Sequence, residues 1–209
     1  MYKKIFRFAL VLIAYGFLFS HNIFAIGSSD GYSGSQNSLQ EFKRRLVEIM
    51  NDTDFNNTGL TMSVYYGSFA GSRNTLQEFK RRFDEIRNDS DFSGNEILSI
   101  YYGNYAGSQN SLEDFKRRLV EIMDDSDFNN MNGTMAIFYG NYAGSRNSLH
   151  EFTRRFSEIM SDADFDNMAF YYSSYAGSQN TLQEFKRRFN EIANDADFNN
   201  MGGTMRLYY

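Results

Sequence analysis

From Gly34 to the end, the chain is one unit of 33 to 37 residues written five times. Each copy opens with Gly-Ser-Gln/Arg-Asn-Ser/Thr-Leu, continues through a segment of the Glu-Phe-Lys-Arg-Arg type, turns at Asp-x-Asp-Phe and ends in a Tyr-rich stretch. Tandem repeats with a period in this range form architectures in which each unit contacts mainly its neighbours. The repeats therefore predict a single domain over 34–209, with units 34–70, 71–106, 107–143, 144–176 and 177–209.

The first 25 residues have a different composition. Lys3, Lys4 and Arg7 precede an apolar run of about a dozen residues, and the small residue Ala25 follows it, which is the pattern of a secretory signal peptide. The run is shorter than the ~20 apolar residues that a membrane-spanning helix needs. We therefore predict a signal peptide over 1–25, a short lead-in over 26–33 and no integral membrane segment after cleavage. The expected location is secreted, periplasmic or at the cell surface of a bacterium.

Charge and composition argue against several classes of function. Removing the signal peptide lowers the net charge from −5 to −8, because three cations leave with it and no acidic residue does; an acidic chain is not expected to bind nucleic acid. The chain has no cysteine. His150 is the single histidine beyond the signal peptide, and the carboxylates recur in every unit, whereas an active site is assembled once. We expect no enzyme, no catalytic residue, no bound metal and no cofactor.

Each unit begins its ordered part with a capping box. A Ser or Thr is followed three residues later by Glu or Asp, so that the hydroxyl accepts from a free amide of the first turn and the carboxylate reaches back to the cap amide. The pairs predict five helix starts. They are Ser38/Glu41, Thr75/Glu78, Ser111/Asp114, Ser148/Glu151 and Thr181/Glu184.

The residues after each cap are apolar with a 3-4-3 spacing, which places them on one face of a helix of about thirteen residues. The first stripe is Leu39, Phe42, Leu46 and Ile49, and the opposite face is expected to hold Glu41, Arg44, Arg45 and Glu48. Stacked copies of Lys-Arg-Arg would form a basic stripe, but the neighbouring carboxylates favour a lattice of ion pairs instead.

The Asp-x-Asp-Phe turn that ends each helix has two interpretations. Short polar side chains suit Asx turns, and the large apolar Phe is expected to plug the core. The same spacing of oxygen ligands matches the first half of a calcium loop, although no Glu closes the shell at the twelfth position. Asx turns are favoured, with calcium as the alternative.

The pattern of the Tyr-rich stretch predicts a β-strand. In the first unit Met62, Val64 and Tyr66 alternate with Ser63, Tyr65, Gly67 and Phe69, which is strand composition with a period of two. Strands joined by helical crossovers lie parallel. The predicted fold class is therefore an α/β repeat, with five helix-strand units stacked as a solenoid or arc and the helices on one face of a predominantly parallel sheet. The rival interpretation breaks the stretch at Gly-Ser/Asn into a hairpin.

Stacked strands would leave two exposed aromatic ladders on the open face of the sheet. Contiguous exposed aromatic patches mark contact surfaces, so these residues are the predicted binding site for a protein or glycan partner. The first ladder is Tyr65, Tyr101, Phe138, Tyr171 and Tyr208, and the second is Phe69, Tyr105, Tyr142 and Tyr175.

The two ends of the array are matching half-units. Asp30 to Gly34 corresponds to the end of a Tyr-rich stretch, and Met205 to Tyr209 corresponds to its beginning. The halves can complement one another within one chain, closing a ring, or between chains, joining them head to tail. The alternative is that duplication left ragged ends.

These features predict a non-enzymatic, exported repeat protein that presents its aromatic sheet face for adhesion or for binding a host or partner molecule. The alternative is a structural or matrix protein that self-assembles through its Tyr-rich ends, as a homo-oligomer or head to tail. A calcium-dependent binding module is the third hypothesis.

Overall fold

The computed structural model of the chain describes residues 31–55, 60–93, 96–128, 135–166, 168–199 and 208–209. The predicted signal peptide and most of the lead-in therefore lie outside the described residues.

Five outer helices begin where the capping boxes predict. In each, the Ser or Thr hydroxyl accepts from the amide three residues on, at 3.1–3.2 Å. The first Phe and the Ile of the predicted stripe are buried in every copy. The carboxylate half of the capping box differs from the prediction, because Glu41 pairs with Arg44. The outer helices are α2 (Leu39–Met50), α4 (Leu76–Arg87), α6 (Leu112–Asp124), α8 (Leu149–Met160) and α10 (Leu182–Ala193).

The Tyr-rich stretches are helices, so the predicted parallel sheet, the α/β class and the rival hairpin are wrong. No strand occurs among the residues that the structure describes. The inner helices are α3 (Leu60–Gly71), α5 (Ile100–Gly107), α7 (Met135–Gly144) and α9 (Ala169–Gly177). Shorter helices are the 3-10 segments η1 (Glu96–Ser99) and η2 (Ala163–Phe165), and α11 (Ala196–Asn199).

The error in the inner segments has a physical origin. Tyr101 and Tyr105 are four residues apart, a separation that keeps them on one face of a strand and also on one face of a helix. The described side chains of the inner helices are mostly buried and include buried polar residues such as Ser68 and Asn104, so these helices lack the amphipathic period that reveals a surface helix. Tertiary burial, rather than β propensity, decides their conformation.

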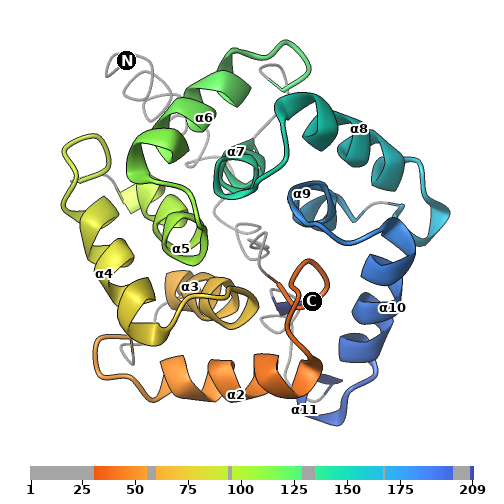
Figure 1. The fold of residues 1–209 in the computed structure, drawn as a ribbon. Helices are drawn as coiled ribbons and strands as arrows, with labels where there is room; N and C mark the ends of the chain where they lie inside the picture. Colours follow the sequence, from red (N-terminus) through yellow and green to blue (C-terminus); the bar gives the residue numbers. More distant parts are fainter. Residues whose placement is uncertain (1–30, 56–59, 94–95, 129–134, 167, 200–207) are drawn as a thin grey trace.

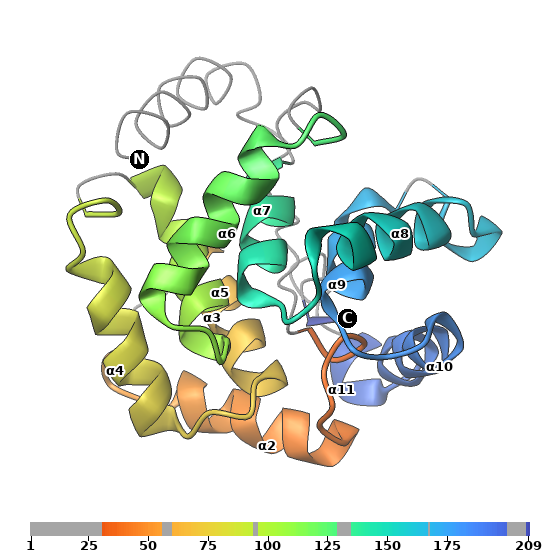
Figure 2. The same cartoon turned by 45° about the horizontal axis from the view of Figure 1, so that its top comes forward.

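The helices form a closed ring of pairs. Figures 1 and 2 show the outer helices lying end to end around the rim and the inner helices side by side within it. The outer helices α2, α4, α6 and α8 each contact the inner helix that follows, and α3, α5, α7 and α9 contact one another in that order. The predicted solenoid or arc is therefore an all-helical ring.

Small residues let the inner helices approach closely. A Cβ atom at Gly140 of α7 would lie 2.6 Å from the side-chain oxygen of Asn104 and 3.0 Å from the ring of Tyr101, both of which belong to α5. Asn104 also donates to Asn141 at 2.9 Å. The glycine therefore makes room for a buried amide contact between neighbouring helices.

The two ends of the array meet within one chain. The Tyr32 amide donates to the Tyr208 carbonyl at 2.8 Å, and the Ser33 amide donates to Tyr209 at 2.7 Å. Figure 1 shows the C-terminus beside the first described residues, at the place where a fifth inner helix would stand. The half-units thus complement one another and close the ring.

Candidate functional site

A buried arginine joins each outer helix to the inner helix behind it. Arg155 of α8 donates to the Tyr175 carbonyl at 2.9 Å, to the Ser178 hydroxyl at 3.1 Å and to the Asn180 carbonyl at 2.5 Å. Its guanidinium also lies 4.1 Å from the centre of the Tyr175 ring. The arginine thereby satisfies free carbonyls at the helix end and stacks on an aromatic ring.

The same contact recurs in every repeat. The expectation that Arg45 lies on the solvent face of its helix is wrong, because its side chain reaches the carbonyl of Phe69. Burial lowers the pKa of these guanidinium groups from the ordinary value. The five residues are Arg45, Arg82, Arg118, Arg155 and Arg188.

The Gly-Ser-Gln/Arg-Asn turns hold one another in sequence around the ring. The Asn147 side chain donates to the carbonyls of Ala176 and Ser178, at 2.7 and 3.0 Å, in the next turn along the chain. At the closure, Asn180 donates in the same way to the carbonyls of Ser33 and Ser35. The asparagine of the motif is therefore a structural link.

Lysine clamps connect four of the five Asp-x-Asp loops to the next outer helix. Lys186 of α10 lies 2.6 Å from Asp162 and 2.9 Å from Asp164, and the Asp164 amide donates to the Asp162 side chain at 3.0 Å as an Asx turn does. The Phe of every loop is buried, as predicted. Within the described ranges no three His, Cys, Asp or Glu side chains converge as a metal site would require. In four of the five loops a lysine ammonium pairs with the carboxylates that suggested calcium.

One of the five clamps is missing. The other four join Lys43 to Asp195 and Asp197, Lys80 to Asp52 and Asp54, Lys116 to Asp89 and Asp91, and Lys186 to Asp162 and Asp164. Helix α8 carries Thr153 at the lysine position. The Thr153 hydroxyl donates to the Leu149 carbonyl at 2.9 Å, within its own helix.

Thr153→Lys is expected to stabilise the ring by about 0.5–1 kcal/mol, because the new ammonium can reach Asp125 and Asp127 as its counterparts do. Urea denaturation measures the change. Thr153→Gln is the control, since it supplies comparable length and helix propensity without charge. Equal effects of Lys and Gln would show that no clamp forms.

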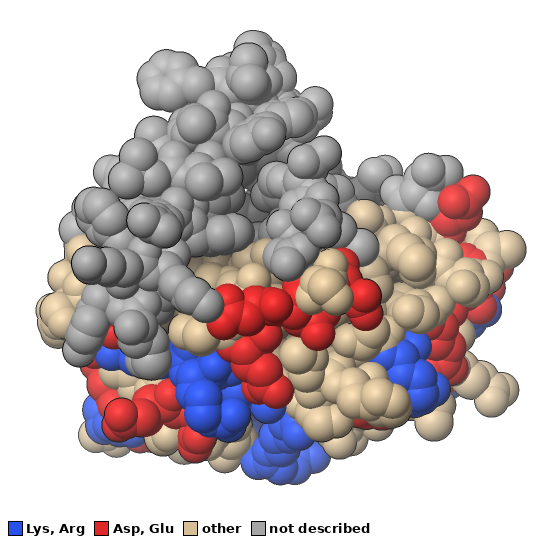
Figure 3. All heavy atoms as spheres, turned by 90° about the horizontal axis from the view of Figure 1, so that it is seen from above, with Lys and Arg blue, Asp and Glu red and all other residues tan. Residues whose placement is uncertain are grey.

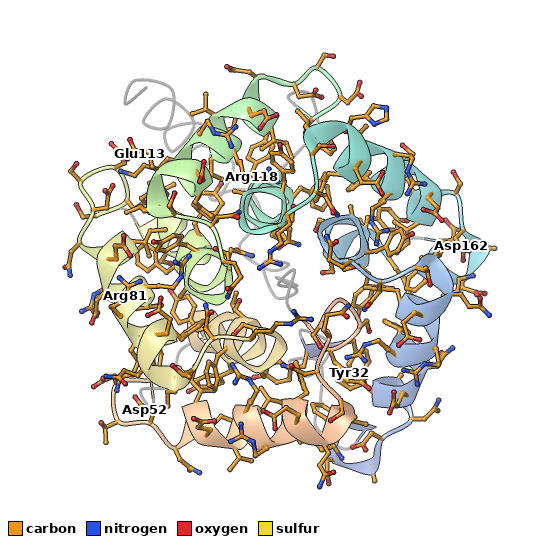
Figure 4. All side chains as sticks on the ribbon, in the orientation of Figure 1. Tyr32, Asp52, Arg81, Glu113, Arg118 and Asp162 are labelled. Carbon is orange, nitrogen blue, oxygen red and sulfur yellow. The ribbon has the colours of Figure 1, made fainter. Side chains whose placement is uncertain are left out.

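The middle arginine of Lys-Arg-Arg lies on the rim and is paired with carboxylates. Arg81, in the copy Lys80-Arg81-Arg82, contacts Glu78 at 2.8 Å and Glu85 at 3.4 Å. Figure 3 shows Lys and Arg beside Asp and Glu on the side it presents, rather than one basic patch. In Figure 4, Arg81 points outward from the ring while Arg118 lies between α6 and α7. The three residues of the motif thus occupy three different environments.

The predicted binding aromatics do not form an exposed face. Tyr105, for example, is 1% exposed and its ring meets that of Phe115 edge-on at 5.5 Å. The expectation of two solvent-facing ladders is wrong because the strands that would display them are helices turned toward the core. Buried are Tyr65, Phe69, Tyr101, Tyr105, Phe138, Tyr142, Tyr175 and Tyr208, and half-buried is Tyr171. The function predicted from that face, and the alternatives built on Tyr-rich strands, lose their structural basis.

The buried phenols predict alkaline unfolding. Burial raises the pKa of Tyr65, Tyr139 and Tyr175 to about 12, so the unfolded chain, whose tyrosines titrate near pH ~10, loses these protons first. Their contribution to stability is complete below pH ~10 and is lost as the pH rises through the folded values.

Ultraviolet absorbance of tyrosinate and far-UV circular dichroism, followed together from pH 8 to 12, check this prediction. The two signals are expected to change in one transition. Ionisation of most tyrosines near pH ~10 with the helices intact would contradict it.

An exposed apolar pair lies on the rim of the first repeat. Val47 and Met50 of α2 are 58% and 49% exposed, and their i,i+3 spacing makes them neighbours on the helix. Repeat 2 carries Asp84 and Arg87 at these positions, joined by an ion pair at 2.8 Å. The pair is not among the predicted site residues, although it carries a sequence signal: both residues are apolar and fall outside the recurring stripe.

A polar surface hollow lies between the first Asp-x-Asp loop and α4, lined by Thr53, Asp54, Lys80, Asp84 and Arg87 among others. Its cations are already paired, Lys80 with Asp54 at 2.6 Å and Arg87 with Asp84 at 2.8 Å. The hollow therefore offers no free charge for a ligand.

Comparison with protein-family models, with curated proteins and with solved structures finds no match for the chain. Within the part of the chain that the structure describes, none of the helices has the length and hydropathy to cross a bilayer.

Proposed function

We propose that this chain is a non-enzymatic scaffold, a rigid helical ring that binds a protein partner through the rim of α2. The observation that carries the proposal is the exposed pair Val47 and Met50. Met is enriched where proteins meet one another, and its flexible thioether adapts to a partner's surface. The site is defined by these two side chains and the polar residues around them.

The residues that recur in all repeats hold the ring together, whereas residues on the rim vary, and this difference supports a scaffold. The arginine, asparagine and cap positions recur in all five repeats and are engaged in contacts that hold the ring together. The pair of rim positions that holds Val47 and Met50 varies more, although Met recurs at the second position in repeats 3 and 4 and Val recurs at the first in repeat 3. The later pairs are Asp84/Arg87, Val120/Met123, Ser157/Met160 and Asn190/Ala193. Side chains without a role between repeats are available for recognition.

Two observations support a non-catalytic role. His150 is exposed on α8, and the Arg–Glu pairs on the outer helices and the four lysine clamps use charged side chains in contacts that recur around the ring. An active site needs convergent groups in one place. We also retain export as a proposal, supported by the composition of residues 1–25.

Site-specific photocrosslinking tests the function. A benzoylphenylalanine placed at position 47, in cells that produce the full chain, is expected to give a discrete protein adduct. The same probe at position 84, the equivalent site on α4, is the matched control. Adding Met50→Arg to the position-47 probe is expected to remove the adduct without unfolding the ring, since repeat 2 carries Arg87 there. Equal adducts at 47 and 84, or none at 47, would refute the proposal.

A further inference from the structure

The fifth inner-helix position is built from two separate pieces of chain. Residues 31–35 supply one piece and residues 208–209 the other, joined by the amides of Tyr32 and Ser33. In the alignment with α5, Tyr208 and Tyr209 correspond to Tyr101 and Tyr102, and Tyr32 and Ser33 correspond to Tyr105 and Ala106. The two bonds therefore have the i to i−4 pattern of an α-helix. Two hydrogen bonds of the helical type thus join segments that are far apart in the sequence.

The aromatic contacts at the closure closely match those of an uninterrupted inner helix. The rings of Phe198 and Tyr208 are 6.4 Å apart, as are those of Phe165 and Tyr171 at the fourth repeat. Phe189 and Tyr209 meet edge-on at 5.6 Å and 89°. The corresponding pair Phe156 and Tyr172 meets at 5.7 Å and 88°. The two final tyrosines therefore occupy sites of the same shape as those in the continuous repeats.

Most of the closing contacts do not involve those two tyrosines. Arg188 donates to the carbonyls of Tyr32 and Asn37, the Tyr32 hydroxyl donates to Glu191 at 2.6 Å, and Lys43 binds Asp195 and Asp197. These bonds hold the walls of the position whether or not it is filled. The donors and rings that receive the final residues belong to Tyr32, Ser33, Phe189 and Phe198.

We propose that this position is a receptor site for a Tyr-Tyr segment, filled here by the chain's own Tyr208 and Tyr209. The segment is held without a covalent link to Gly31, so it can leave and return while the other repeats stay folded. The same segment supplied in trans, by a peptide or a second copy, fits the vacated site. The inference is independent of the rim surface on α2.

Hydrogen exchange resolved at single amides tests the release. The Tyr32 and Ser33 amides are expected to exchange at least tenfold faster than their equivalents Tyr105 and Ala106 in α5. The continuous helix is an internal control at matched positions. Equal protection at both places would show that the segment does not leave separately, and would overturn the proposal.

Peptide binding tests the receptor. The full chain carrying Tyr208→Ala and Tyr209→Ala is incubated with the peptide MGGTMRLYY, the sequence of residues 201–209, or with MGGTMRLAA. The tyrosine peptide is expected to restore protection of the Tyr32 and Ser33 amides by tenfold or more, and the alanine peptide is not.

Native mass spectrometry of the wild-type chain with excess peptide provides a second readout, which does not depend on the folding of the variant. A one-to-one complex with MGGTMRLYY and none with MGGTMRLAA is expected. Equal binding of the two peptides, or no binding of either, would overturn the receptor site.

Discussion

Replacing Arg155 with alanine is expected to lower the free energy of unfolding by about 3–5 kcal/mol, because the buried side chain bonds several acceptors that would lose their partner. The acceptors are the Tyr175 carbonyl, the Ser178 hydroxyl and the Asn180 carbonyl. The variant also loses the stack on the Tyr175 ring. Denaturation in urea, followed by circular dichroism, measures the loss.

The neighbouring arginine is the matched control. Arg154→Ala removes an equally large cation one residue away, but its side chain is 52% exposed and pairs with Glu151 and Glu158 in water. Such exposed pairs contribute about 0–1 kcal/mol. Equal losses for the two variants would contradict the assignment of the third residue of the motif as the buried one. Arg155→Lys is expected to resemble alanine more than arginine, because an ammonium lacks the planar fork.

Phe165→Ala is expected to cost about 3–5 kcal/mol, the range for removing a fully buried aromatic ring. Phe165 is 2% exposed and lies between repeats, with its ring 5.8 Å from that of Phe185 and 5.4 Å from that of Phe189, both on the next outer helix. The substitution would therefore leave a cavity in the joint between α8 and α10.

Thermal and urea denaturation check this second prediction, with Asp164→Ala as the control in the same loop. The Asp164 side chain is 73% exposed and contributes one side of the lysine clamp, so its loss is expected to cost less than about 1 kcal/mol. A small effect of Phe165→Ala would show that the loop aromatics do not seal the joints.

The outer half of each repeat could be predicted from its residues because its signals are local. The capping hydroxyl of Ser148 and the stripe of Phe152, Phe156 and Ile159 depend on spacing along one helix, and all of these apolar side chains are buried. The Phe of the Asp-x-Asp-Phe turn was likewise identified as a core plug, since a large apolar ring in a polar loop has few other uses.

The candidate site was less predictable. The aromatic residues predicted to bind a partner, such as Tyr142, are buried in the core. The prediction that they are exposed is wrong because it depends on a sheet that does not form. The rim pair Val47 and Met50 is visible in the sequence only after the recurring stripe has been assigned to the core. The role of Arg155 was also hidden, since nothing local distinguishes it from Arg154 except a rotation of one residue around the helix.

The sequence by itself determined the five-fold repetition, the helix starts, the buried face of each outer helix and the complementary half-units at the two ends. Only the tertiary structure decided that the Tyr-rich segments are helices, that the array closes within one chain and that Tyr32 meets Tyr208. The physical reason is the same in each case. A helix with one face in water has an amphipathic sequence pattern that predicts it, whereas a segment that is buried on most sides takes its conformation from the residues that pack around it.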